Sequence, residues 1–153
     1  MKPTDQFAVS DPNYERRVRE SFSRQGLMKH FGARLTELAP GRAEIRAVHR
    51  EELTQQHGYF HAGVSGSLAD VACGYAAYTL MPEDSSVLTV EYKINLMAPA
   101  AGEELIARAR VVRSGKTLKI CAADVFARKG EVEAHCATVL ATIMCLAGKA
   151  DGR

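Results

Sequence analysis

Asp70 is the residue whose chemistry stands out, because it is a single carboxylate in an otherwise uncharged stretch. No Lys or Arg occurs from Glu51 to Tyr92, and Asp70 is the only acidic residue between Glu52 and Glu83. Burial of a lone carboxylate among apolar residues is costly unless something compensates the charge. Such an acid is typical of a functional site. The alternative is that Asp70 only hydrogen-bonds neighbouring backbone.

The residues around Asp70 predict a buried helix that begins near His61. They are mostly Ala, Gly, Ser and Cys, and they are apolar or small on every face, which is typical of a buried helix. The first turn, at Ala62 and Gly63, leaves backbone N–H groups unpaired, and such groups suit an oxyanion. Together with an acid two turns further on, this arrangement predicts acyl-transfer chemistry. One group would polarise a carbonyl, and the other would activate water.

Three other motifs are better explained as ordinary structure. Gly63–Ser67 misses the spacing of a serine nucleophile elbow by one residue. Ser114–Thr117 lacks the first glycine of a P-loop, since Arg110 stands in that place, and it predicts a hairpin turn instead. His57 and His61 are four residues apart, but a glycine lies between them and no Cys or further acid is near in sequence. We therefore expect no metal site.

The composition predicts one globular domain without nucleic-acid or membrane partners. The chain has 153 residues, of which 46% are hydrophobic and 25% charged, and its net charge of +2 is evenly scattered. The four cysteines form no C-x-x-C pair and are expected to be buried in a reducing compartment. The first residues lack the apolar core of a signal peptide, and no apolar run is long enough for a bilayer. We expect a cytoplasmic protein.

The elements that must position Asp70 predict an α+β fold. Residues 1–12 are expected to be flexible, and residues 13–148 to form a single domain. A short amphipathic N-terminal helix capped at Asp11 should stop near Gly26. Consecutive turn-linked strands predict an antiparallel sheet that wraps around the buried helix. The predicted strands are 31–38, 42–48, 88–96, 105–112, 118–127 and 132–146.

The strand at 88–96 is expected to have one buried and one polar face. Every second residue from Leu88 to Leu96 is apolar, and the residues between them are polar. This period-two alternation is typical of a half-buried strand.

The motifs also carry a family resemblance. The chain has Gln55, Gly58, His61-Ala62-Gly63 and Leu68-Ala69-Asp70 in that order, followed by Thr89–Ala100, Gly102-Glu103 and Ser114–Thr117. From Gln55 to Leu146 this order resembles the hotdog-fold acyl-CoA thioesterases of the phenylacetate-degradation (PaaI) type. Their pattern is an Asn, a Gly, His-Gly-Gly, and an Asp nine residues after the histidine. The resemblance implies the hotdog fold, in which a curved antiparallel sheet wraps around one long helix.

The resemblance also implies roles for individual residues. Asp70 would be the catalytic carboxylate, as general base or nucleophile, and the N–H of Ala62 or Gly63 would hold the thioester oxygen. His61 would shape this oxyanion hole, and Thr89 would assist from the following strand. In the family the site forms between two subunits, with the acid from one and the oxyanion donor from the other.

Two residues depart from the family pattern. The family asparagine is absent, and Gln55 or Gln56 must replace it with a longer side chain. Ala62 stands where the family has the first glycine of His-Gly-Gly, so the N–H is kept but the space above it is narrower. Both changes affect the expected size of the substrate and the rate of hydrolysis.

The expected function is hydrolysis of an acyl-CoA to a carboxylic acid and free CoA by a homodimer or a dimer-of-dimers tetramer, without metal or redox cofactor. No Lys or Arg lies between Arg50 and Lys93, so Arg113 and Lys116, which flank a predicted turn, are the candidates for binding the CoA phosphates. Hydration of enoyl thioesters is not expected, because no histidine accompanies Asp70 on the helix. The alternative from another class is a non-catalytic acyl-CoA-binding protein.

Overall fold

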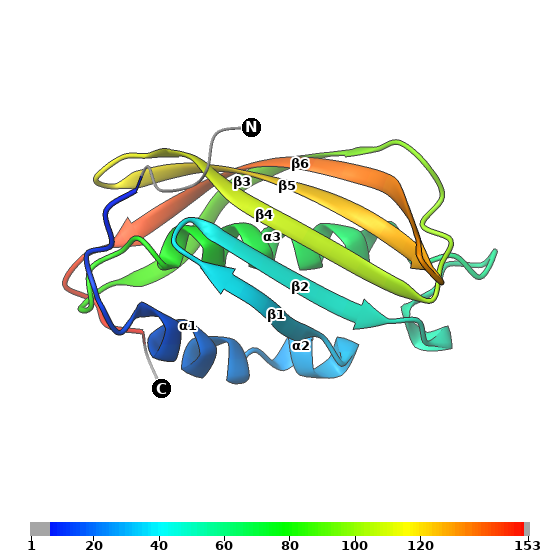
Figure 1. Cartoon of the computed structure of the whole chain (residues 1–153), viewed down its shortest axis with the longest axis horizontal. Helices are drawn as coiled ribbons and strands as arrows, with labels where there is room; N and C mark the ends of the chain where they lie inside the picture. Colours follow the sequence, from blue (N-terminus) through cyan, green and yellow to red (C-terminus); the bar gives the residue numbers. More distant parts are fainter. Residues whose placement is uncertain (1–6, 152–153) are drawn as a thin grey trace.

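A six-stranded antiparallel sheet curves around one long helix in the computed structural model, which describes residues 7–151 (Figure 1). The strand order is β1-β2-β4-β5-β6-β3. This confirms the predicted α+β hotdog arrangement. The helices are α1 (Tyr14–Ser23), α2 (Gly26–Phe31) and α3 (Ala62–Tyr78), with a short 3-10 turn at Glu51–Leu53. The strands are β1 (Arg34–Ala39), β2 (Arg42–Val48), β3 (Ser86–Leu96), β4 (Glu104–Ser114), β5 (Leu118–Lys129) and β6 (Val132–Leu146).

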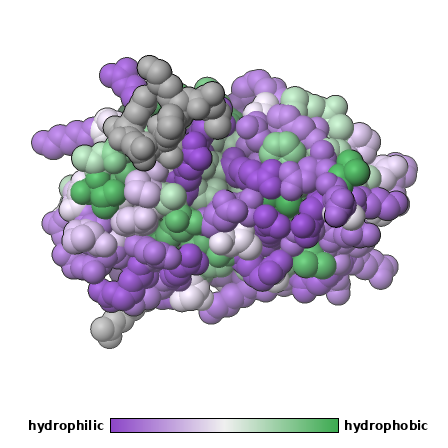
Figure 2. Space-filling view, viewed as in Figure 1, coloured by the Kyte–Doolittle hydropathy of each residue, from purple (hydrophilic) through white to green (hydrophobic). Residues whose placement is uncertain are grey.

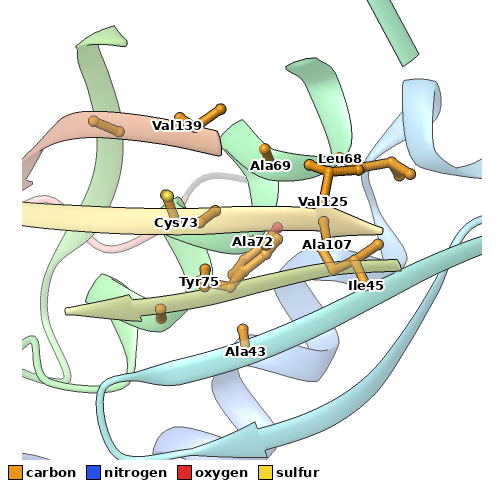
Figure 3. Packing of buried hydrophobic residues seen from close by; sticks show 14 of the residues in the cluster. Ala43, Ile45, Leu68, Ala69, Ala72, Cys73, Tyr75, Ala107, Val125 and Val139 are labelled. Atoms are coloured by element: carbon orange, nitrogen blue, oxygen red, sulfur yellow. The ribbon is translucent and has the colours of Figure 1, made fainter. Parts of the chain in front are cut away.

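The buried helix predicted around Asp70 is α3. Its side chains, among them Leu68 and Ala72, point toward Ile45, Ala107 and Val125 on the facing strands (Figure 3). Small residues on both the helix and the strands let the sheet approach the helix closely on several sides. The four cysteines are buried free thiols, as expected. Within residues 7–151 no helix is long and apolar enough to cross a membrane.

Polar groups hold the two ends of α3 in place. At the start, the Gly63 N–H donates to His61 Nδ1 at 2.8 Å, so His61 is the N-cap. Just past the end, Thr79 is fully buried and its hydroxyl donates to the Ala76 carbonyl at 2.7 Å. Thr79 Oγ1 also accepts the Gly41 N–H at 2.8 Å. This second bond joins the end of α3 to the β1–β2 hairpin.

The N-terminal region differs from the prediction. The N-cap position of the first helix is Asn13 rather than Asp11, although the Asp11 carboxylate accepts the Asn13 N–H at 2.8 Å. The helix ends at Ser23. A second helix, α2, occupies the place where a strand was expected to start. Gly32 ends α2 in the left-handed conformation at φ 63°, and the Ala33 N–H closes this end on Met28 O at 2.9 Å. The first strand therefore begins only at β1.

Asp11 ties the start of α1 to the end of α3. Residues 1–6 of the predicted flexible segment lie outside the described residues, but Asp11 is only 2% exposed. Its carboxylate accepts from Arg17 Nε at 2.8 Å, and the same guanidinium donates to Met81 O at 2.8 Å. Arg17 also lies over the Tyr78 ring at 4.2 Å. The boundary between a flexible segment and the domain stays a prediction.

The prediction of one buried face on β3 is wrong for the single chain. Leu88, Val90, Tyr92 and Leu96 are between 43% and 57% exposed. A bulge between Thr89 and Glu91 interrupts the alternation, and β3 is the last strand of the sheet. No strand among residues 7–151 pairs with its outer edge. Of the five apolar residues of the alternation, Ile94 is the one that is partly buried against the core.

The outer face of β2 and β4 is polar, and Figure 2 shows mainly hydrophilic side chains over this side of the molecule. Glu44 is buried there and accepts from Arg46 Nε at 2.7 Å and Arg108 Nε at 2.8 Å. Burial alone would raise the pKa of Glu44, but these hydrogen bonds and one from Thr36 lower it overall. The ionised network joins the strands on the face that points away from α3.

Replacement of Thr79 by Val should destabilise the fold. The change keeps the shape but leaves the buried Gly41 N–H without an acceptor, which costs about 1–3 kcal/mol. Urea denaturation should show this loss in the free energy of unfolding. The matched variant Thr117→Val removes an exposed hydroxyl and should change stability by less than about 0.5 kcal/mol. Equal stability of the two variants would show that the Thr79 bond does not hold α3.

Candidate active site

Asp70 lies on the side of α3 that faces β3. It is half-buried, and the Thr89 hydroxyl donates to its Oδ1 at 2.7 Å. Burial raises the pKa of Asp70, and the hydrogen bond from Thr89 lowers it by a smaller amount, so the pKa lies above that of an ordinary aspartate. The structure therefore places Thr89 next to Asp70, as the resemblance implied. A carboxylate whose proton affinity is raised is suited to take a proton from water.

A cavity of about 80 Å³ opens beside the acid. It lies between α3, β3 and the junction of α1 and α2. Its lining consists of Gln25, Asp70, Val71, Gly74, Tyr75, Val87 and Thr89.

The start of α3 offers one free backbone donor. Gly63 donates its N–H to His61 Nδ1 at 2.8 Å, so this group is occupied. The Ala62 N–H, in contrast, has no acceptor within residues 7–151, and Ala62 is exposed. Since His61 Nδ1 accepts a hydrogen bond, the ring proton of the neutral imidazole is on Nε2. Of the two donors that the sequence left open, the geometry favours Ala62, with His61 holding the turn that presents it.

A second cavity, of about 300 Å³, lies at this end of α3. Gln55 lines it together with Ala62, whereas Gln56 is exposed and lines neither this cavity nor the one beside Asp70. The Gln55 side-chain oxygen accepts from the His57 N–H in the same loop. The position therefore favours Gln55 as the replacement for the family asparagine. The other lining residues are Tyr59, Phe60, Ser65, Leu96, Ala98, Pro99, Ala100 and Cys136.

The acid and the free donor do not meet within one chain. Asp70 follows Ala62 by eight positions on a straight helix, which separates them by about 12 Å along the axis. A general base and an oxyanion donor must each lie within about 3 Å of the reacting groups. The two groups also line different cavities. A single chain thus contains two half-sites.

Arg113 and Lys116 are not brought to Asp70. Their turn joins β4 to β5, and the Gly115 N–H closes it on Leu118 O at 2.9 Å, which confirms a hairpin turn. Arg113 is paired with Ile120 on the face away from α3. In the strand order, β4 lies three strand spacings from β3, about 14 Å.

Some residues of the acid's cavity were missed by the sequence analysis. Gln25 stands between two short helices and has no local signal that links it to Asp70. Gly74 follows Asp70 by four positions, and Gly74 and Tyr75 follow Val71 by three and four, which places neighbouring members of this set on one side of a helix. That spacing is the signal that could have found them. Within residues 7–151 no three His, Cys, Asp or Glu side chains gather as a metal site would require.

The chain belongs to the Thioesterase superfamily. The model of this family matches residues 57–134, which is half of the chain and includes α3 with both half-sites. A 1,4-dihydroxy-2-naphthoyl-CoA hydrolase of Listeria monocytogenes is 27% identical over 62% of this chain and 77% of its own length. The class of protein that the fold and the matched region define is therefore a hotdog-fold thioester hydrolase.

Solved structures agree with this assignment. A thioesterase family protein from Silicibacter pomeroyi superposes with a TM-score of 0.87 at 47% identity, over 88% of this chain and 99% of that protein. The PaaI protein of the E. coli phenylacetic acid degradation operon superposes with a TM-score of 0.79, over 94% of this chain and all of that one. At 19% identity the likeness to PaaI shows the fold alone.

Replacement of Thr89 by Val should shift the pH dependence of catalysis. The Thr89 hydroxyl stabilises the ionised form of Asp70, so its loss should raise the pKa of Asp70 further. If activity needs the carboxylate, the acid limb of the kcat/KM profile lies above the ordinary aspartate pKa in the parent. It should move to higher pH in the variant.

The chain offers a matched control for this experiment. The Thr138 hydroxyl also donates to an aspartate, Asp124 Oδ1 at 2.8 Å, but on the outer face of the sheet. The variant Thr138→Val should keep the parent profile. An acid limb that does not respond to Thr89→Val would mean that Asp70 is not the group being titrated.

Proposed function

We propose that this protein is a homodimeric acyl-CoA thioesterase of the PaaI type, which hydrolyses an acyl-CoA to a carboxylic acid and free CoA. The observation that carries the proposal is the pair of half-sites on α3. Asp70 has a raised pKa beside one cavity, and the free Ala62 N–H lies beside the other. Membership of the Thioesterase superfamily supports thioester hydrolysis, and the Listeria relative supports a CoA thioester as substrate.

A second copy of the chain fits the open edge of β3. This edge is unpaired and carries exposed apolar side chains, and such an edge is a template for another strand. Gly66 is midway between Ala62 and Asp70, and a Cβ built there would lie 3.4 Å from the Tyr92 hydroxyl on β3. A twofold axis that passes near these two residues exchanges the ends of the two α3 helices. Asp70 of one subunit then faces the partner's Ala62.

In the composite site, each group has one task. The thioester oxygen accepts a hydrogen bond from the Ala62 N–H, where the positive end of the α3 dipole stabilises the developing oxyanion. Asp70 from the other subunit either takes a proton from a water molecule, whose oxygen then bonds to the carbonyl carbon, or bonds to that carbon itself and forms a mixed anhydride that water hydrolyses. In both routes the C–S bond breaks, and the CoA thiolate leaves and takes up the proton that the water loses. Thr89 orients the carboxylate, and Gln55 lies beside the oxyanion donor.

Two single variants should each abolish most of the activity without unfolding the protein. Asp70→Asn removes the base and should lower kcat by roughly 100- to 10,000-fold. Ala62→Pro replaces the N–H by a ring carbon, at a first helical position that tolerates proline, and should lower kcat by at least roughly 100- to 1,000-fold. His61 precedes it at φ −64°, ψ 142°, a conformation compatible with a following proline.

Co-expression of the two variants distinguishes a composite site from a site within one chain. In a mixed dimer, one site carries both changes and the other carries neither. Random assembly should therefore restore about a quarter of the parent activity. If each site were made by one chain, the mixture would stay inactive. If the parent binds acyl-CoA but hydrolyses none, the protein is the non-catalytic acyl-CoA-binding alternative.

We further propose that Arg113 and Lys116 bind the nucleotide phosphates of CoA. The pantetheine arm separates these phosphates from the thioester, so basic residues remote from Asp70 can serve them. Arg113→Ala combined with Lys116→Ala should raise KM for acyl-CoA and make it less salt-sensitive, with kcat little changed. A short acyl-pantetheine thioester lacks the phosphates and should be turned over equally by parent and variant. An unchanged KM for acyl-CoA at low and high salt would place the phosphate site elsewhere.

A further inference from the structure

We infer that the cavity beside Asp70 is the acyl subsite and that the Gln25 amide in its wall selects short, uncharged acyl groups that carry a hydroxyl. This inference rests on the proposed thioesterase function. It adds the substrate class, and it assigns a role to three residues outside the two half-sites, Gln25, Gly74 and Tyr75.

Gly74 shows that the space beside the acid is kept open. A glycine within a helix is about 1 kcal/mol less favourable than alanine. Gly74 is buried, yet a Cβ built there would meet no heavy atom within 4 Å. It lies one turn beyond Asp70 and lines the same cavity. Packing within the chain therefore gives no reason for the missing side chain, and the open space can take part of a ligand.

The far wall of the cavity is polar. The Gln25 amide N–H donates to the Tyr75 hydroxyl at 3.3 Å, and that hydroxyl is also bonded to Ser21 Oγ at 3.1 Å. The backbone N–H of Gln25 donates to Phe22 O, and its carbonyl accepts from the Lys29 N–H, so the residue is held on both sides. Within residues 7–151 the side-chain oxygen of Gln25 accepts no hydrogen bond. It is therefore available to a hydroxyl group on a ligand.

The volume of the cavity and the charge of its lining limit which acyl groups it can bind. The cavity has about 80 Å³, roughly half of a cavity of about 150 Å³ that holds benzene. The cavity therefore suits a small acyl group. The lining contains no Lys or Arg, and Asp70 carries the only charge, so a second carboxylate on the acyl group would be repelled. A hydroxyl both donates and accepts, and it can pair with Gln25 in either orientation of the amide.

The volumes of the two cavities indicate which one holds the acyl group and which one holds the pantetheine arm. Pantetheine must run from the thioester to solvent, and a cavity of about 80 Å³ is too small to hold this arm. The cavity of about 300 Å³ beside Ala62 is larger and has mostly apolar walls, which suits the arm. The acyl group is then held by the subunit that supplies Asp70.

The test compares kcat/KM for butyryl-CoA, 3-hydroxybutyryl-CoA and octanoyl-CoA. The parent should prefer the hydroxylated substrate over butyryl-CoA by roughly 5- to 10-fold, the effect of one net hydrogen bond, and should turn over octanoyl-CoA least. Gln25→Leu keeps the size but removes the amide, so this preference should disappear while butyryl-CoA is still hydrolysed. A preference that persists in Gln25→Leu would overturn the role of Gln25.

Gly74→Val tests the location of the subsite. It should fill the cavity and lower kcat/KM for both four-carbon substrates by roughly 10-fold or more, with acetyl-CoA much less affected. Gly26→Val is the matched control, because a Cβ there also meets nothing within 4 Å but Gly26 does not line the cavity. Equal effects of Gly74→Val on acetyl-CoA and butyryl-CoA would overturn the acyl subsite and leave the thioesterase function intact. A parent that hydrolyses none of the CoA thioesters would overturn both proposals.

Discussion

The rigidity of α3 is the constraint on which the rest of this structure depends. The helix holds Asp70 and the free Ala62 N–H about 12 Å apart, and neither can move toward the other without breaking helical hydrogen bonds. A carbonyl group is far smaller than this separation. Under the proposed function, the two groups act together only across a twofold axis, and the axis must lie near the middle of the segment that joins them. The unpaired apolar edge of β3 lies beside this middle, at Tyr92.

The composition of α3 explains how a carboxylate can be held inside the sheet. Ala, Gly, Ser and Cys let the strands approach the helix backbone closely, so Asp70 is partly withdrawn from water although its side chain is short. This withdrawal raises the pKa of Asp70, while the hydrogen bond from Thr89 limits the rise. A base works best when its pKa is close to the working pH but still permits ionisation. Burial thus raises the pKa of Asp70, and the hydrogen bond from Thr89 lowers it.

Local features of this chain could be predicted from its sequence, whereas features that only the tertiary fold creates could not. The helix α3, the strand Arg42–Val48 and the strand Val132–Leu146 were predicted well, because the signal of each lies within one continuous segment. These signals are small residues on every face, period-two alternation and a long apolar run, respectively. The contact of Thr89 with Asp70 came from family resemblance, since nothing in the spacing of two separate elements requires it. The burial of β3 was predicted wrongly because the alternation does not show whether another part of the chain covers its apolar face. Gln25 was missed because only the tertiary fold brings the α1–α2 junction beside the acid.

Gly66 and Gly74 in α3 differ in what surrounds them. Each costs about 1 kcal/mol relative to alanine, and the chain accepts both in its most buried element. At Gly66 a Cβ would lie 3.4 Å from the Tyr92 hydroxyl, so the position is already in contact with the β3 edge. At Gly74 a Cβ would meet no heavy atom within 4 Å. Because Gly74 is a full turn beyond Asp70, a side chain there would change the volume beside the acid without displacing the acid or its bond to Thr89. Under the acyl-subsite proposal, position 74 is therefore the place where substrate size can change while the catalytic geometry is kept.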